Sequence, residues 1–337
     1  MRAIKKFSFL FLSLVLISGG IHSEIEYPWK NIYIGAFEAR AWNGLLFSPD
    51  ENSAFAFRIK IEKEGEIIDG EDLYYIISEV GPHSPDGQYA RLKLDLSLPF
   101  NIGSDTPILI KPPSTQDTFI FEWSRQDEKT VVGRIQAPEG MIIHLVNYFP
   151  WDLRGEYRIR DDRQVQGECE GANNYKYLLW TDPGGDLTLG IEREEVIHSF
   201  TRGRDRSVYF VAGVGEDADI IHNQIQNYKN RKTIDTILLD EERRYRRRRA
   251  KVEGLYAGAA RAVSNNLFWT TLYQPGHHRI YAPSGRTRIQ PTPEGNPGHW
   301  TIYEWASFFK ALEAAVESSK HAKDIIRAVL ERQFPNG

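Results

Sequence analysis

The hydrophobic pattern of this 337-residue chain changes its period near Gly215. Before that point apolar residues alternate with polar ones, as at Phe55, Phe57, Ile59 and Ile61 and again at Leu92, Leu94, Leu96 and Leu98. A period of two is typical of antiparallel strands with one buried face. After Gly215 the period becomes that of a helix. The sequence therefore predicts a β region followed by an α region.

The β region, residues 24–215, contains many short strand-like runs. Turn signals rich in Pro and Gly separate them, for example between Pro82 and Gly87 and between Pro183 and Gly185. Short strands at this spacing predict a β-sandwich of two packed antiparallel sheets. Besides the two alternating segments, the expected strands are Thr118–Trp123, Thr130–Ile135, Met141–Tyr148, Tyr175–Trp180, Leu187–Glu192 and Ser207–Val214.

Residues 216–252 predict a helical linker between the two regions. One helix is expected over Glu216–Tyr228 and a highly charged one over Lys232–Lys251. Six arginines in the second helix suggest a nucleic-acid surface. We favour a solvated helix instead, because Asp240, Glu241 and Glu242 directly precede the arginines and the chain has a net charge of −4.

Residues 253–337 predict helices. The first is expected over Leu255–Thr271, followed by the irregular segment His277–Gly298. Two apolar stripes with helical spacing then follow, separated only by residues 318–320. They predict an antiparallel helical hairpin. The first stripe is Trp305, Phe308, Phe309, Leu312, Ala315 and Val316; the second is Ala322, Ile325, Ile326, Val329 and Leu330.

The hairpin sequence resembles a known enzyme family. The segments Y-E-W-A-S-F-F-K-A-L-E-A and A-K-D-I-I-R-A-V-L-E-R-Q-F-P-N-G resemble the six-hairpin glycosidases, closest to glycoside hydrolase family 63 and mannosylglycerate hydrolase-like proteins. The resemblance implies a multidomain β + α fold, in which an N-terminal antiparallel β-sandwich precedes the first helices of an (α/α)6 barrel. It implies inverting hydrolysis of an α-glucoside or α-mannoside. The chain departs from the family pattern at Ala306, where the family has Asp.

The resemblance also implies which side chains bind the sugar. Trp305 takes the place of the family tryptophan in the pocket, and Phe309 lies one turn along; for Phe309, packing in a core is an equal alternative. Tyr303 and Glu304 offer partners for sugar hydroxyls, although Glu304 also suits the first turn of a helix. Further candidates are Trp269 and Tyr273 near a helix end, and Arg288 in the loop, which suits a substrate carboxylate or is simply solvated.

The catalytic acid and base remain unassigned. Inverting glycosidases need two carboxyl groups roughly 6.5–9.5 Å apart, and in the resembled families both follow the hairpin described above. We therefore expect them beyond Gly337 and expect this chain to be an incomplete, truncated form. Three of the twelve helices of such a barrel leave apolar faces exposed to water, which normally indicates a missing partner.

Residues 1–23 resemble a secretory signal peptide. Arg2, Lys5 and Lys6 precede an apolar run, and small residues follow it. We expect a secreted or periplasmic protein without a stable membrane anchor. Cys169 is the single cysteine, so no intrachain disulfide or cysteine-based metal site is expected, and no cofactor is implied.

An alternative function is a non-catalytic secreted carbohydrate-binding protein. In that hypothesis the sandwich binds an oligosaccharide or small glycoside through Trp42, Trp123, Trp151 or Trp180. Tryptophans on strand-like segments are more often core residues. A purely structural envelope protein is a third, weaker possibility.

Overall fold

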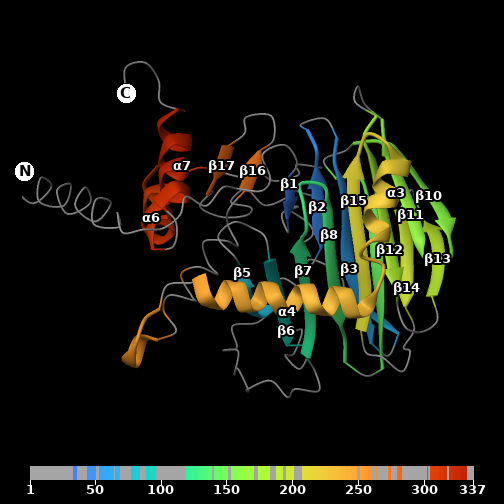
Figure 1. Cartoon of the computed structure of the whole chain (residues 1–337), viewed down its shortest axis with the longest axis horizontal. Helices are drawn as coiled ribbons and strands as arrows, with labels where there is room; N and C mark the ends of the chain where they lie inside the picture. Colours follow the sequence, from blue (N-terminus) through green and yellow to red (C-terminus); the bar gives the residue numbers. More distant parts are fainter. Residues whose placement is uncertain are drawn as a thin grey trace, which may run out of the picture.

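The computed structural model contains two antiparallel sheets and a smaller helical part (Figure 1). Its described residues are 33–35, 44–50, 53–63, 65–68, 77–83, 89–95, 118–138, 140–150, 153–170, 174–182, 187–192, 195–200, 207–248, 251–257, 259, 263, 272–274, 279–282, 302, 304–316 and 319–331. The signal-like residues 1–23 lie outside this part of the chain. Within it, no helix combines the length and apolar character needed to cross a membrane.

The first sheet has seven strands, in the order β1-β2-β3-β9-β14-β13, with β4 paired to β3. Its strands are β1 (Tyr33–Gly35), β2 (Leu45–Ser48), β3 (Phe55–Lys63), β4 (Glu66–Ile68), β9 (Met141–Tyr148), β13 (Leu187–Glu192) and β14 (Glu195–Phe200). All of the pairings are antiparallel.

The second sheet has eight strands, in the order β10-β11-β12-β15-β8-β7-β6-β5. Its strands are β5 (Ile77–His83), β6 (Tyr89–Asp95), β7 (Thr118–Arg125), β8 (Thr130–Gln136), β10 (Gly155–Asp161), β11 (Gln164–Cys169), β12 (Lys176–Asp182) and β15 (Ser207–Gly215). The strand-like runs predicted from the sequence coincide with strands of these two sheets, with small shifts at their ends. The exception is the end of the run at Leu96 and Leu98, which lies outside the described residues.

The two sheets pack face to face around one core. Phe57 of β3 makes edge-on ring contacts with Phe121 of β7 and Phe210 of β15, at centroid distances of 6.2 and 5.4 Å. The alternating residues of β3 that the sequence singles out are fully buried. Gly133 leaves room for this packing, since a Cβ there would lie 2.1 Å from the Phe210 ring. The period-two pattern thus correctly predicts which side of β3 faces the core.

Two helices cover the outer face of the eight-stranded sheet. They are α3 (Ala218–Gln226) and α4 (Arg231–Arg248), and the Asp217 side chain caps α3 by accepting from the amides of Asp219 and Ile220. The sequence predicts a solvated linker here. In the structure, one side of each helix is buried against the sheet, because apolar residues recur at helical spacing even within the charged segment. These buried residues are Ile221, Ile225, Ile234, Leu238 and Tyr245.

The helical part near the C-terminus contains α6 (Glu304–Ala315) and α7 (Ser319–Leu330), which lie side by side in Figure 1. They form the hairpin that the two stripes predict. A short hairpin of β16 (Leu272–Gln274) and β17 (Arg279–Tyr281) precedes them, and a 3-10 turn covers Gly254–Tyr256. Most of the helix expected over Leu255–Thr271 lies outside the described residues.

Candidate functional site

Helix α6 carries two exposed aromatic side chains at its N-terminal end. Trp305 is 69% exposed and Phe309 is 53% exposed. Their rings meet edge to face, with centroids 5.8 Å apart and planes at 79°. Glu304, also exposed, is in the first turn, where the helix dipole favours a carboxylate. Helix α6 therefore presents two exposed aromatic rings, set nearly perpendicular to each other, with a carboxylate in the same turn.

The opposite face of α6 explains why the aromatic rings face water. Its buried residues are Ser307, Ala311 and Ala314, and the two alanines pack against Ala322 and Ile325 of α7. The Ser307 hydroxyl donates to the carbonyl oxygen of Ala282 at 3.2 Å. Small side chains allow the two helices to approach closely, while Trp305, Phe309 and Val316 of the predicted stripe remain exposed. The exposed apolar face expected from the sequence is therefore present.

The remaining predicted site residues are not brought together by described structure. Tyr303, Trp269 and Arg288 lie outside the described residues, and Tyr273 is placed only through the backbone of β16. Of the segment His277–Gly298, which the sequence predicts to be irregular, the structure describes only 279–282. The prediction is wrong there, because Arg279–Tyr281 forms strand β17. Trp305, Phe309 and Glu304 are thus the three predicted residues whose surroundings are defined.

Lys310 is a nearby titratable group that the sequence reasoning missed. Burial lowers the pKa of its ammonium to about 8, although the carboxylate of Glu313 acts in the opposite direction. A lysine in the middle of an amphipathic helix gives no sequence signal of this kind, because the shift arises from tertiary burial.

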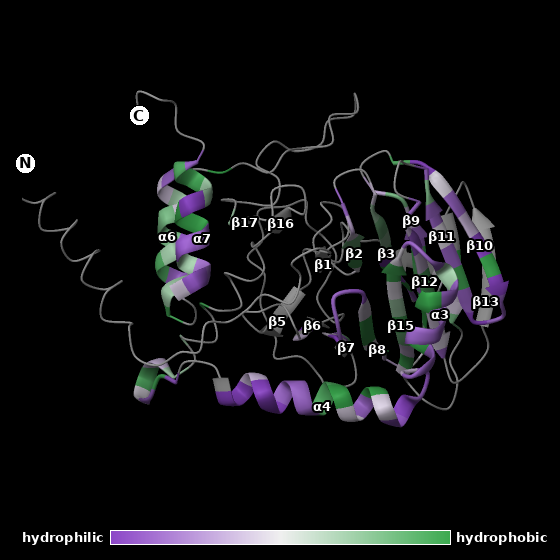
Figure 2. Ribbon diagram, turned by 45° about the horizontal axis from the view of Figure 1, so that its top comes forward, coloured by the Kyte–Doolittle hydropathy of each residue, from purple (hydrophilic) through white to green (hydrophobic). Residues whose placement is uncertain are grey.

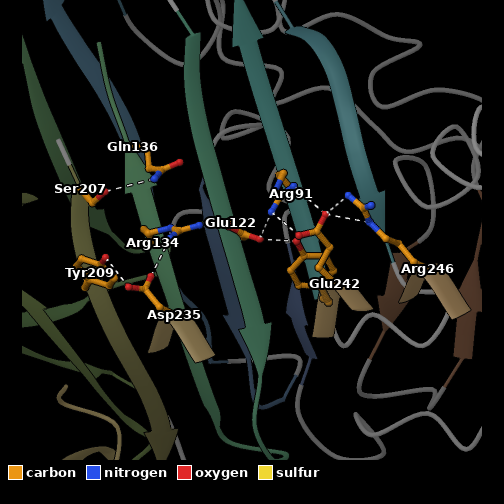
Figure 3. A network of polar contacts seen from close by, with 10 residues as sticks. Arg91, Glu122, Arg134, Gln136, Ser207, Tyr209, Asp235, Glu242 and Arg246 are labelled. Carbon is orange, nitrogen blue, oxygen red and sulfur yellow. Dashed lines mark hydrogen bonds and ion pairs between the residues drawn. The ribbon is translucent and has the colours of Figure 1, made fainter. Parts of the chain in front are cut away.

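A second polar cluster lies between the eight-stranded sheet and α4 (Figure 3). The Glu122 side chain is 1% exposed and accepts from Arg91 at 2.6 Å, from Arg134 at 2.8 Å and from the hydroxyl of Tyr89. Burial and the neighbouring Glu122 carboxylate raise the pKa of Tyr89. Burial by itself would lower the pKa of the Arg91 guanidinium. The neighbouring Glu122 carboxylate has the opposite effect, and the pKa of Arg91 is raised.

Helix α4 supplies the other carboxylates of this cluster. Asp235 accepts from Arg134 at 2.8 Å and from the Tyr209 hydroxyl at 3.0 Å. Glu242 accepts from Arg246 at 2.6 Å and from Arg91 at 3.2 Å. Burial would raise the pKa of Glu242, but its bonds to the two arginines lower it. Since each carboxylate is matched by guanidinium groups, the cluster suits attachment of α4 to the sheet and leaves no free acid or base.

Metal binding finds no support among the described residues. They contain no group of three or more His, Cys, Asp and Glu side chains able to hold an ion. Cys169, the single cysteine, is buried, and its thiol donates to the carbonyl oxygen of Arg154 at 3.5 Å.

Two of the four tryptophans named in the carbohydrate-binding alternative lie within the described residues. Trp123 is 2% exposed in the inner core and Trp180 is 8% exposed beneath the covering helices. Neither ring is exposed enough to stack on a sugar. Two of the four tryptophans proposed to bind sugar in the sandwich are therefore excluded. Trp42 and Trp151 lie outside the described residues.

Comparisons with known proteins give structural neighbours only. No protein-family model and no curated protein matches the chain. Among solved structures, a bacterial glucoamylase complexed with acarbose has a TM-score of 0.44 at 8% identity, covering 72% of this chain. A family GH92 inverting mannosidase from Bacteroides thetaiotaomicron has a TM-score of 0.41 at 11% identity, covering 76%.

Both neighbours are glycoside hydrolases, and the chain spans 38% of the length of each. A family GH92 α-mannosidase from the same organism has a TM-score of 0.35 at 12% identity. The alignment covers 67% of this chain and 33% of the mannosidase chain. At these scores the likeness is too slight to decide either the family or the reaction.

Proposed function

We propose that this chain belongs to a secreted glycoside hydrolase of the six-hairpin kind, similar to glycoside hydrolase family 63 and the mannosylglycerate hydrolase-like proteins. Its reaction would be inverting hydrolysis of an α-glucoside or α-mannoside. In this proposal residues 1–23 are the signal peptide, 24–215 the sandwich, 216–252 the linker and 253–337 the start of the catalytic helical domain.

The observation that carries the proposal is the exposed aromatic pair on α6. Leaving a Trp and a Phe in water forgoes the stabilisation that burial of such rings supplies, about 1.5–3 kcal/mol for a Phe. Exposed apolar clusters on a folded protein commonly mark binding surfaces. A flat ring can stack on the C–H face of a pyranose, and a carboxylate such as Glu304 can accept from its hydroxyls. The pair also coincides with the motif that resembles the glycosidases.

In the proposed site Trp305 is the main stacking surface and Phe309 its edge. Glu304 and Tyr303 would bind sugar hydroxyls, Trp269 and Tyr273 would extend the apolar wall, and Arg288 would bind a substrate carboxylate. No residue of this chain is assigned as the catalytic acid or base. Ala306 supplies no hydroxyl acceptor, so the proposal gives that contact to another group.

The test is a sugar-binding titration followed by tryptophan fluorescence. Maltose, an α-mannobiose and mannosylglycerate are added to the protein and to its Trp305→Ala variant. Loss of one stacking surface is expected to weaken binding roughly tenfold, which corresponds to about 1.4 kcal/mol. Val316→Ala is the control, since Val316 is an apolar residue 47% exposed directly after the last residue of α6.

Three results separate the possibilities. Binding that depends on Trp305 supports the aromatic sugar site, and release of reducing sugar would in addition reveal a catalytic acid and base within this chain. Binding that Trp305→Ala leaves intact favours the non-catalytic alternative, in which tryptophans of the sandwich bind the sugar. Equal binding by Trp305→Ala and the control, or no binding at all, contradicts the proposed site.

A further inference from the structure

Helix α4 carries its acidic and basic side chains on different sides. Asp235 and Glu242 point to the sheet, where they bind Arg134 and Arg91 (Figure 3). Glu241 is also buried, with 9% of its surface exposed. Of the four acids of this helix, Asp240 has the most exposed side chain, and Glu241 pairs with Arg244 of the same helix at 2.9 Å. The two acids that bind the sheet, Asp235 and Glu242, thus leave fewer carboxylates than arginines on the outer side of α4.

The solvent side of α4 is correspondingly cationic. Its exposed basic residues are Lys232, Arg243, Arg244, Arg246 and Arg247, and Figure 2 shows hydrophilic residues along most of the helix. Arg246 is bonded to Glu242, but the contact of Arg243 with Asp240 is 3.4 Å long and both side chains are more than half exposed. Such a pair contributes little. Among the described residues no ion pair to Arg247 occurs.

This cationic face is held rigidly. Buried Ile234, Leu238 and Tyr245 attach the helix to the sheet, and Arg231 binds Asp182 through contacts of 2.7 and 3.0 Å. Arg243 and Arg247 are four residues apart, so they project from successive turns about 6 Å apart along the axis. A preorganised row of guanidinium groups suits a chain of repeated carboxylates, because little ordering is lost on binding.

The residue types on the solvent side of α4 favour one class of polyanion over the others. Proteins that bind single-stranded nucleic acid stack its bases on exposed aromatic rings, but the one aromatic residue of α4, Tyr245, is 2% exposed. Helices that lie in a lipid surface need a broad apolar face, and Leu239 is the one large apolar residue exposed on α4. We therefore propose that the solvent face of α4 binds an acidic polysaccharide, independently of the aromatic pair on α6.

The experiment measures binding of the whole chain to immobilised polygalacturonate between 20 and 200 mM NaCl. With about three cationic contacts, counterion release predicts a loss of affinity of roughly twenty- to fortyfold between 50 and 200 mM salt. The variant R243Q/R247Q is expected to lose about tenfold in affinity at low salt. The matched control is R158Q/R160Q, which removes the same charge from exposed positions on β10.

Several outcomes would overturn the inference. They are the absence of salt-sensitive binding, an equal loss of affinity in R158Q/R160Q, and equally tight binding of single-stranded DNA or of anionic lipid vesicles by the unmodified protein. Folding of each variant is checked by its Tm. If R243Q/R247Q melts early, the charge-preserving R243K/R247K decides the question, because it must keep most of the affinity while R158Q/R160Q stays unchanged.

Discussion

The sandwich and the C-terminal hairpin bury opposite kinds of side chain. The sandwich core contains fully buried aromatic residues from both sheets, such as Phe57, Phe121 and Phe210. The hairpin core consists mainly of alanines, and its Trp305 and Phe309 remain in water. Burial of large apolar side chains is the main favourable term in folding. The sandwich therefore gains most of its stability from its own core, whereas the hairpin leaves two of its largest apolar side chains exposed to water.

The largest effect is expected in the sandwich core. Phe57→Ala removes a ring that contacts both Phe121 and Phe210, and should lower the free energy of unfolding by about 3–5 kcal/mol. Urea denaturation monitored by circular dichroism measures the change. A loss below about 1 kcal/mol would mean that the two sheets do not pack as described.

A somewhat smaller loss is expected from the polar cluster outside the core. Glu122→Ala leaves Arg91 and Arg134 facing each other without their shared carboxylate, which should cost about 3 kcal/mol. The same denaturation assay applies. Gln136→Ala is the control nearby, since the Gln136 amide makes only a 3.5 Å contact with Ser207. Equal effects of the two substitutions would contradict a central role for Glu122.

Acid should weaken both regions through buried histidines. Burial lowers the pKa of His198 in the sandwich to about 3 and that of His321 in the hairpin to about 4. Below the unfolded pKa of about 6.5, the unfolded chain binds the proton and the folded chain does not, so stability falls as the pH falls. We expect roughly 1.4 kcal/mol of loss per pH unit and per histidine between pH 6.5 and the folded pKa.

The comparison of unfolding at pH 7 and pH 5 checks this pH dependence. His198→Gln and His321→Gln should each flatten the profile. His198→Gln should do so down to about pH 3, and His321→Gln only down to about pH 4. A profile that the two variants share with the unmodified protein would show that neither histidine stays neutral in the fold.

A phenylalanine in the hairpin should matter far less than one in the sandwich. Phe309→Ala removes a half-exposed ring and its edge contact with Trp305, so we expect a loss below about 1 kcal/mol. Urea denaturation of Phe309→Ala and Phe57→Ala under the same conditions compares the two losses in the free energy of unfolding. Equal losses in the two variants would show that the α6 aromatic pair is part of a core.

The smallest effect is expected at Tyr177, in the centre of the sandwich. Its buried hydroxyl has no hydrogen-bond partner in the part of the chain that the structure describes, and burial raises its pKa well above the usual value. Tyr177→Phe removes that unsatisfied group, so stability should stay the same or rise by up to about 1 kcal/mol. A Tm scan detects the direction. A clear drop in Tm would indicate that a bonded water satisfies the hydroxyl.

Sequence patterning predicted most elements but not how α4 and α6 are oriented. The strands and both hairpin helices follow from the period of their apolar residues. The buried side of α4 was missed because only every third or fourth residue is apolar, and the charges between them dominate the composition. The stripe of α6 was located correctly, but its exposure depends on the small residues Ser307, Ala311 and Ala314, which carry no strong signal by themselves.

By itself the sequence determined the strand faces, because a period of two fixes which side chains share a side of a sheet. It also located the aromatic motif of α6. The tertiary structure alone decided which charges meet: Arg91 and Glu242 are 151 positions apart, and Arg134 and Asp235 are 101 apart. No local pattern links such residues. Their contact depends on how a helix docks on a distant sheet. That docking leaves Arg243, Arg244, Arg246 and Arg247 of α4 exposed to water.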